Sequence, residues 1–340
     1  MKELLKKYCN AFGPSGLEDE VRELIKDDVA PYADSVSTDG CGNLIVFKKG
    51  KERRPHKLLL SAHMDEVGFM ITYFSDEGFA YFETIGGVDP RVIAGKRVSL
   101  GSRRIPAVVA AKAIHMQKPK ERGVPEKISD MFIDFGCVSK EDSLYKLSIG
   151  DCAVFEPNFS EFGSGFIKSK AIDDRAGCAV LVSLLKKEAE YDTYYAFTTA
   201  EEVGCRGAAG VAASIGAEVT VVIESTTAGD IAGTPKSRQA CRVGDGAVIS
   251  FMDGSTIYPR ELVDISLELA SEKGIKVQLK NLAVGGNEAG IYQRTASGSR
   301  VLALSAPVRY IHSSCSVVKE DDLMQLYALA EAITERSTLI

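Results

Sequence analysis

Residues 58–68 of this 340-residue chain read LLLSAHMDEVG, an apolar run that ends in a histidine and an aspartate. The run Leu58–Leu60 predicts a short buried strand, which His63 and Asp65 follow directly. Open α/β sheets bind their ligands at the carboxyl ends of their strands. The stretch therefore indicates an α/β fold and marks the edge of the sheet at which a site is expected.

Three further apolar runs are followed by acidic or imidazole side chains in the same way. These are Tyr195–Phe197 before Glu201 and Glu202, Val221–Ile223 before Glu224, and Val301–Leu304 before His312. Asp173 and Asp174 stand at the start of a predicted helix, after a loop. Because the strand ends meet at one edge of a sheet, we expect these side chains to converge on one crevice.

The expected cluster has the composition of a metal site. Two histidines with four or five carboxylates suit zinc, cobalt or manganese. They offer more carboxylates than one tetrahedral ion needs, which favours two ions with a bridging carboxylate, about 3.5–4 Å apart. Zinc is the first expectation, with cobalt or manganese as alternatives.

The rest of the chain falls into two regions with different sequence patterns. Between residues 69 and 162, short alternating stretches broken by glycine and proline predict a compact strand-rich insert. Residues 1–68 and 163–340 form the second region, in which helices alternate with apolar strands. Its predicted helices are one that begins at Ser15 with a capping box to Glu18, and others over Asp174–Lys187, Pro259–Lys273 and Lys319–Arg336.

Composition excludes several classes of function. The net charge of −6 and a pI near 5.5 give no attraction toward nucleic acid or an anionic membrane. No window approaches the ~18 apolar residues of a membrane span, and no signal peptide is evident. The eight cysteines are scattered without a Cys-x-x-Cys pair, which is typical of reduced thiols in a cytoplasmic protein.

Four motifs, in order along the chain, resemble those of the tetrahedral aminopeptidases, metallopeptidase family forty-two, whose members include glutamyl and deblocking aminopeptidases. They are AHMDEVG at 62–68, KAIDDRAG at 170–177, TAEEVG at 199–204 and PVRYIHS at 307–313. The resemblance implies an α/β/α exopeptidase domain with a mixed sheet and two metal ions. It also implies that the insert is a β-barrel or PDZ-like dimerisation domain.

The resemblance assigns a role to each candidate residue. Asp173 would bridge the two ions, His63 and Glu224 would bind one of them, and Glu202 and His312 would bind the other. Asp65 would orient the imidazole of His63 or act on the site electrostatically. Glu201 would be the general base on a water that bridges the ions. Substrates would be short peptides cut at the N-terminus, and dimers would assemble into a hollow tetrahedral dodecamer.

Two departures from the family pattern concern the ligands and the pocket. Glu224 stands where many relatives carry Asp, and we keep it as a ligand. Residues 285–290 read GGNEAG, where relatives commonly show Gly-Gly-Thr-Asp-Ala. We assign this loop no metal ligand and expect it to line the substrate pocket. His56 and His115 lack a matching motif and are interpreted as structural residues.

Three alternatives to the aminopeptidase stay open at this point. One is another hydrolase on the same two-metal plan, such as a deacylase or carboxypeptidase. A second is glycoside hydrolysis, a label that relatives have sometimes carried, although that chemistry usually needs two carboxylates and no metal. The third is a non-catalytic scaffold, against which the presence of both Glu201 and Glu202 argues.

Overall fold

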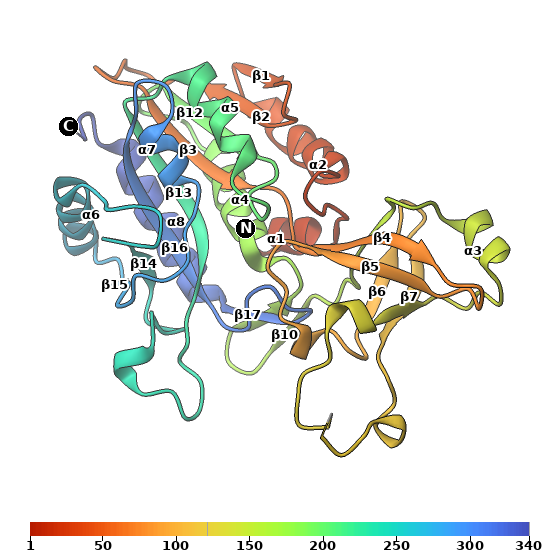
Figure 1. The fold of residues 1–340 in the computed structure, drawn as a ribbon. Coiled ribbons are helices and arrows are strands. Elements are labelled where there is room, and N and C mark those ends of the chain that lie inside the picture. Colours follow the sequence, from red (N-terminus) through yellow and green to blue (C-terminus); the bar gives the residue numbers. More distant parts are fainter. Residues whose placement is uncertain (121, 340) are drawn as a thin grey trace.

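An eight-stranded mixed sheet is the centre of the larger part of the protein (Figure 1). The computed structural model describes residues 1–120 and 122–339. In sheet order the strands are β1 (Ser35–Thr38), β2 (Leu44–Lys48), β12 (Thr193–Thr198), β3 (Leu58–His63), β13 (Val219–Thr227), β16 (Arg300–Val308), β14 (Ala247–Ile249) and β15 (Val277–Leu279). The four central strands, β12, β3, β13 and β16, run parallel to one another, so their carboxyl ends share one edge.

Helices cover both faces of this sheet, which explains why its central strands are apolar runs without alternation (Figure 1). On one face α4 (Ile172–Leu185) packs beside α8 (Glu320–Glu335), and α5 (Arg206–Ile215) packs beside α7 (Ala289–Arg294) on the other. Outside these, α1 (Lys2–Asn10) and α2 (Asp19–Val29) contact α4, and α6 (Arg260–Lys273) contacts α8. One continuous apolar core lies between these layers.

A closed six-stranded barrel with its own core stands to one side of the sheet (Figure 1). Around the barrel the strands are β4 (Gly68–Phe74), β5 (Ala80–Ile85), β8 (Phe132–Asp134), β7 (Ile105–Ala110), β6 (Arg97–Leu100) and β9 (Cys152–Phe155). The short helix α3 (Lys140–Lys146) lies before β9. Phe69 contacts the rings of Phe82 and Phe155 edge-on, at centroid distances of 5.1 and 5.3 Å.

A small three-stranded sheet lies where the chain returns from the barrel. Strand β10 (Ser160–Phe162) pairs with β11 (Phe166–Ser169), which pairs with β17 (Ser316–Lys319). Because β17 follows β16 and precedes α8, this sheet joins the chain leaving the barrel to the C-terminal part of the larger unit.

The helix predicted to begin at Ser15 is the clearest error of the sequence interpretation. The helix, α2, begins at Asp19, and its N-cap Glu18 makes no side-chain cap. Ser15 and Glu18 hydrogen-bond elsewhere instead, as described below. The helices predicted near 174–187, 259–273 and 319–336 correspond to α4, α6 and α8, whereas α1, α5 and α7 were not predicted.

Two further observations bear on the setting of the protein. Across residues 1–120 and 122–339, no helix combines the length and the apolarity that a membrane span requires. All eight cysteines are free thiols.

Candidate metal centre

Each of the four parallel strands delivers one part of the site at the same edge of the sheet. His63 is the last residue of β3, and it lies opposite Thr198, the last residue of β12. Glu201 and Glu202 follow β12, Glu224 is the sixth residue of β13, and His312 follows β16. Asp173 comes from the non-helical first turn of α4. Residues that are far apart in the sequence, from His63 to His312, thus meet at one place.

Asp173 stands between two sets of donor atoms. Its Oδ1 lies 3.4 Å from Nε2 of His63, and that same Nε2 lies 3.5 Å from Oε1 of Glu224. Its Oδ2 lies 3.1 Å from Nε2 of His312, which in turn lies 3.2 Å from Oε2 of Glu202. The two carboxylate oxygens of Asp173 therefore face two different His–Glu pairs, the arrangement that a bridging ligand requires.

The charges at this centre are unbalanced toward the negative. Burial raises the pKa of Glu201 and of Glu224 to about 7, and neighbouring carboxylates add to the effect. Burial and the nearby Asp173 also hold the pKa of Glu202 well above its usual range. Burial opposes protonation of His312, yet its contacts with Asp173 and Glu202 raise its pKa to about 10. Three of the four crowded carboxylates are thus short of positive charge, whereas at Asp173 the raising effect of burial is outweighed by the contacts with His312 and His63, which lower its pKa.

Unpartnered oxygens support a cation site in the same place. Oδ1 of Asp173 and Oε1 of Glu202 are buried and accept no hydrogen bond from the described residues. A buried carboxylate oxygen without a donor is costly unless a cation contacts it. The donor set of imidazole nitrogens and carboxylate oxygens suits divalent zinc, cobalt or manganese. The residues present therefore fit the two cations expected from the sequence.

Asp174 is a further carboxylate at this place that the sequence did not mark as a ligand. Donor atoms of His63, Asp174 and Glu224 lie within 4.8 Å of one another, as do those of His63, Asp173 and Glu202. Oδ1 of Asp174 accepts the backbone N–H of Gly177 at 3.0 Å, so this carboxylate caps the start of the regular part of α4. We therefore treat Asp173 as the ligand and Asp174 as support for the helix.

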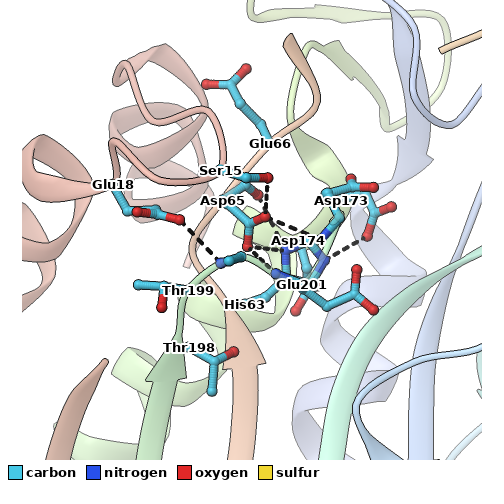
Figure 2. A network of polar contacts seen from close by, with 12 residues as sticks. Ser15, Glu18, His63, Asp65, Glu66, Asp173, Asp174, Thr198, Thr199 and Glu201 are labelled. Atoms are coloured by element: carbon cyan, nitrogen blue, oxygen red, sulfur yellow. Dashed lines mark hydrogen bonds and ion pairs between the residues drawn. The ribbon is translucent and has the colours of Figure 1, made fainter. Parts of the chain in front are cut away.

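Asp65 holds the loop that carries the two glutamates (Figure 2). Its Oδ1 accepts the backbone N–H of Glu201 at 3.0 Å, and its Oδ2 accepts that of Glu202 at 3.1 Å. The same Oδ1 lies 3.4 Å from Nδ1 of His63. Asp65 thus contacts the imidazole nitrogen that faces away from Asp173, and it fixes the backbone on the opposite side of the cluster.

The loop before α2 reinforces this arrangement (Figure 2). Ser15 donates from its hydroxyl to Oδ2 of Asp65 at 2.6 Å. Oε1 of Glu18 accepts the backbone N–H of Gly16 at 2.8 Å and that of Ala200 at 3.1 Å. Ser15 and Glu18, which the sequence suggested as a capping box, therefore support the glutamate loop, Glu18 directly at Ala200 and Ser15 through Asp65.

A buried ion cluster lies behind the site. Nζ of Lys170 lies 2.6 and 2.7 Å from the two carboxylate oxygens of Glu66, and it also donates to the carbonyl of Ala11. The guanidinium of Arg175 donates to the carbonyls of Tyr8 and Gly13 and lies 3.4 Å from Glu66. This cluster connects the N-terminal segment to the strand and helix that carry His63 and Asp173.

Strained backbone is concentrated around the centre. Seven described residues other than glycine have positive φ; four of them, Ala171, Ala200, Tyr310 and His312, belong to the motif segments, and Cys205 directly follows one. Such conformations cost about 1–3 kcal/mol each and persist where surrounding contacts enforce them. At His312, Nδ1 contacts the carbonyl oxygen of Gly87 at 2.9 Å, so the barrel segment helps to set the direction of the ring.

The centre forms one wall of a cavity of about 320 Å³. Asn287, from the GGNEAG loop, lines it as expected, whereas Glu288 is fully buried behind and accepts the hydroxyl of Ser61 at 2.7 Å. Lys280 also lines the cavity. A second cavity, of about 560 Å³, lies on the other side of His312, between Gly87–Lys96 of the barrel and Tyr310–Cys315.

Several functional contacts could not be found from the sequence. Lys280 lies at the end of a short, half-buried edge strand that carries no motif. Cys205 donates from Sγ to Oε1 of Glu201 at 3.1 Å; its place four residues after Glu201 is the only sequence signal. His56 is buried outside the cluster, and His115 is exposed in a short 3-10 turn of the barrel region.

Comparison with known proteins places these motifs in one family. The family model of the M42 glutamyl aminopeptidases matches residues 42–329. A putative aminopeptidase of Acetivibrio thermocellus is 37% identical over 98% of both chains. The lysyl aminopeptidase of Pyrococcus furiosus is 28% identical over 98% of this chain and 96% of its own. The glutamyl aminopeptidase of Lactococcus lactis is also 28% identical, over 94% of this chain and 91% of its own.

Solved structures agree with the whole fold. A TET aminopeptidase of a marine sediment Thaumarchaeota archaeon superposes with a TM-score of 0.94 at 32% identity, covering 98% of this chain and 96% of its own. The TET1 peptidase of Pyrococcus horikoshii superposes with a TM-score of 0.86 at 32% identity, covering 98% of both chains. That peptidase is described as assembling into a tetrahedron or a large octahedral shell.

Proposed function

Because the chain belongs to the M42 glutamyl aminopeptidase family, it is an aminopeptidase, and we propose that it removes N-terminal residues from short peptides with two divalent cations and Glu201 as general base. The observation that carries the proposal is the position of Asp173, whose two carboxylate oxygens face two separate His–Glu pairs. We propose zinc, cobalt or manganese as the cations and the cytoplasm as the location.

Five side chains would hold the cations. His63, Glu224 and Asp173 would hold one, and Asp173, Glu202 and His312 the other. When bound, such cations polarise a carbonyl oxygen and lower the pKa of water. Asp65 keeps Nε2 of His63 directed at Asp173 and Glu224, because the other ring nitrogen faces the carboxylate and the carbonyl of Asp65.

Glu201 moves the proton in this mechanism. Its carboxylate accepts a proton from the attacking water as the new carbon–oxygen bond forms at the scissile carbonyl. It then delivers that proton to the nitrogen of the leaving amine as the carbon–nitrogen bond breaks. Burial raises the pKa of Glu201 above that of an ordinary glutamate, which favours a carboxylate that can accept a proton. Cys205 orients the carboxylate through its thiol.

The free amino group of the substrate would select N-termini. In the proposed arrangement the α-amine would bind a cation or the carboxylate of Glu201, the one carboxylate of the cavity wall that holds no cation. We propose that the N-terminal residue occupies this cavity and that the remainder of the peptide extends past His312 into the second cavity.

Chelation and reconstitution test the proposal. The purified protein is stripped with chelator, reloaded with zinc, cobalt or manganese, and assayed on free and N-acetylated aminoacyl anilides. We expect cleavage of the free-amine substrates alone, and a loss of about 10²–10⁴-fold in kcat for Glu201→Gln with its metal content unchanged. Cleavage of the acetylated set would indicate a deacylase. Chelator-insensitive cleavage of glucans would indicate a glycoside hydrolase, and the absence of all cleavage a scaffold.

We also propose that the barrel of residues 69–162 is the dimerisation domain and that dimers assemble into a tetrahedral dodecamer. Seven large apolar side chains among the described residues are more than 60% exposed, and six of them lie between residues 114 and 149. Val138 and Tyr145 are the most exposed, at 85% and 86%. Apolar surface of this kind favours burial against another subunit.

Light scattering after gel filtration tests the assembly. The subunit mass is 36.6 kDa, so a dodecamer is distinguished from a dimer or monomer at once. We expect Tyr145→Glu to lower the mass of the particle without changing the melting temperature of the subunit. Tyr32→Glu, at a half-exposed tyrosine far along the chain from the barrel, is the matched control. If the double variant Tyr145→Glu, Val138→Glu forms a particle of unchanged mass, this surface is not a subunit interface.

A further inference from the structure

The second cavity, of about 560 Å³, lies next to the catalytic one and has a wall of different character. The two cavities share Ile311 and His312, and the rest of the second wall comes from the connection of β5 to β6 and from residues 310–315. Val92, Ile311 and the exposed ring of Tyr310 give this wall apolar surface. In the proposed function the peptide beyond the cleaved bond lies here, so this wall decides which peptides fit.

The second cavity has few charged side chains. Apart from His312, which holds a cation in the proposed function, they are Asp89 and Lys96. Asp89 is occupied, because its carboxylate accepts the backbone N–H of Arg91 at 2.9 Å and the Nε–H of the same residue at 2.8 and 2.9 Å. Lys96 is therefore the charged group of this wall that remains for a ligand.

Lys96 is held in place by its backbone and not by its side chain. The chain turns at Gly95, where φ is +77°, and the N–H and the carbonyl oxygen of Lys96 hydrogen-bond to Ile93 and Val109 at 3.0 and 2.9 Å. The side chain is half-buried. Within residues 1–120 and 122–339, its ammonium has neither a carboxylate in salt-bridge distance nor a hydrogen-bond acceptor. The three N–H donors of this ammonium are thus open to a ligand.

A carboxylate is the group that such a lysine recognises in a peptide. An ion pair is stronger where apolar side chains displace water, and Val92 and Tyr310 stand in the same wall. Every peptide with an unblocked C-terminus ends in a carboxylate. Each residue adds at most about 3.3–3.6 Å to an extended chain, so a fixed ammonium meets the C-terminus of peptides of only one or two lengths.

We propose that Lys96 binds the C-terminal carboxylate of the substrate, so that this enzyme acts preferentially on peptides of one short length with an unblocked C-terminus. The proposal rests on the aminopeptidase function proposed above and adds a carboxylate-binding subsite beyond the cleaved bond. The test separates it from two other assignments. One is a carboxylate from an acidic side chain beyond the cleaved bond, and the other is capture of the C-terminus by Lys280 in the catalytic cavity.

A ladder of peptides with paired C-termini isolates the charge. Leu-Ala, Leu-Ala-Ala and Leu-Ala-Ala-Ala are each assayed as the free acid and as the amide with the metal-reconstituted protein. We expect kcat/KM to favour the acid by about 5–30-fold at one length, between the effect of an exposed ion pair and that of a hydrogen bond to a charged group. At the other lengths acid and amide should be cleaved nearly equally. The preference should weaken at high salt, because Lys96 is half-buried and not fully shielded from solvent.

Variants assign the preference to Lys96. In Lys96→Gln the ratio of acid to amide should fall toward one at every length, with little change in the cleavage of the amides, and Lys96→Arg should keep most of the preference. Arg97→Gln is the matched control, because it removes a positive charge one residue away. The side chain of Arg97 is 72% exposed, pairs with Glu156 and does not line the cavity. The ratio in this variant should equal that of the wild type.

Calorimetry gives a readout that is independent of turnover. The metal-loaded Glu201→Gln variant is titrated with the three peptides as acids and as amides, with and without Lys96→Gln. We expect the acid of one length to bind more tightly than its amide only where Lys96 is present. If the wild type cleaves no peptide with a free amine, the proposed function is wrong, and this titration still decides the role of Lys96.

Four results would overturn the assignment. Equal cleavage of acid and amide at every length would show that the second cavity does not bind the C-terminus. A preference of wild-type size in Lys96→Gln would exclude this lysine. Loss of the preference in Lys280→Gln but not in Lys96→Gln would place the C-terminus in the catalytic cavity. A preference for Leu-Asp amide over Leu-Asn amide that depends on Lys96, without a preference for the acids of the ladder, would assign the lysine to an acidic side chain.

Discussion

Oδ1 of Asp65 accepts the backbone N–H of Glu201 at 3.0 Å, so the carboxylate beside His63, a proposed metal ligand, also fixes the residue proposed as the base. The neighbouring N–H of Glu202 binds the other oxygen at 3.1 Å. One side chain thereby sets the spacing between a histidine, a ligand and the base.

Asp65→Asn is expected to lower kcat by about 10–100-fold, the usual effect of losing a group that orients metal ligands. The amide can accept only one of the two N–H groups, and its NH₂ would face the other. Steady-state kinetics with metal analysis measure the effect. Asp322→Asn is the control, because Asp322 also accepts two backbone N–H groups, those of Gly244 and Gly246, far along the chain from the site. An equal loss of kcat in both variants would show a general effect on folding.

Glu18→Ala is expected to lower kcat about tenfold, and Glu18→Gln to retain most of it. One oxygen of Glu18 accepts the backbone N–H groups of both Gly16 and Ala200, and glutamine keeps such an oxygen. Removing it leaves two N–H groups without a partner, at about 1–3 kcal/mol each if they stay buried. The kcat values and urea denaturation of the two variants measure this. If Glu18→Gln lowers kcat as much as Glu18→Ala does, the charge of Glu18 is required and its acceptor oxygen alone is not sufficient.

Glu66→Gln is expected to destabilise the fold by about 3–5 kcal/mol, because Lys170 would remain charged and buried without its partner. Urea denaturation of the metal-loaded protein measures the change. The double variant Glu66→Gln, Lys170→Met removes both charges and should recover part of the stability. A double variant less stable than the single one would show that the lysine is stabilised by its contact with Ala11 alone.

The stability of the chelator-treated protein should fall as pH rises from about 5 to about 8. Burial raises the pKa of Glu224 to about 7, so the folded protein without cations binds a proton there that the unfolded chain has released above about 4.5. The raised pKa of His312 likewise makes the stability of the stripped protein fall as pH rises, over a higher range of pH. Cations need the deprotonated groups, so the gap in melting temperature between loaded and stripped protein should widen with pH. A gap independent of pH between 5 and 8 would contradict the ligand role of Glu224.

The sequence predicts the framework of the site well for a physical reason. β3, β12, β13 and β16 are largely buried on both faces, so each appears as an apolar run, and the polar residues that end or follow it form the candidate metal centre. Ser15 and Glu18 show what local sequence patterns cannot predict. Their spacing fits a capping box, but the hydroxyl and the carboxylate bind Asp65 and Ala200, which no local pattern reveals. Lys280 was missed for the same reason, since its neighbours in the cavity lie far from it in the chain.

The cavity is built from two kinds of structural element. The residues proposed for chemistry lie at the ends of four adjoining strands in the middle of the sheet, where a change in one shifts the others. Lys280 to Asn287 form a loop after an edge strand, which can change in length and sequence while the core stays packed. Substitutions in the exposed part of this loop, residues 281–286, can therefore alter the rim of the cavity without disturbing the residues proposed for chemistry, and libraries aimed at new specificities have most freedom there.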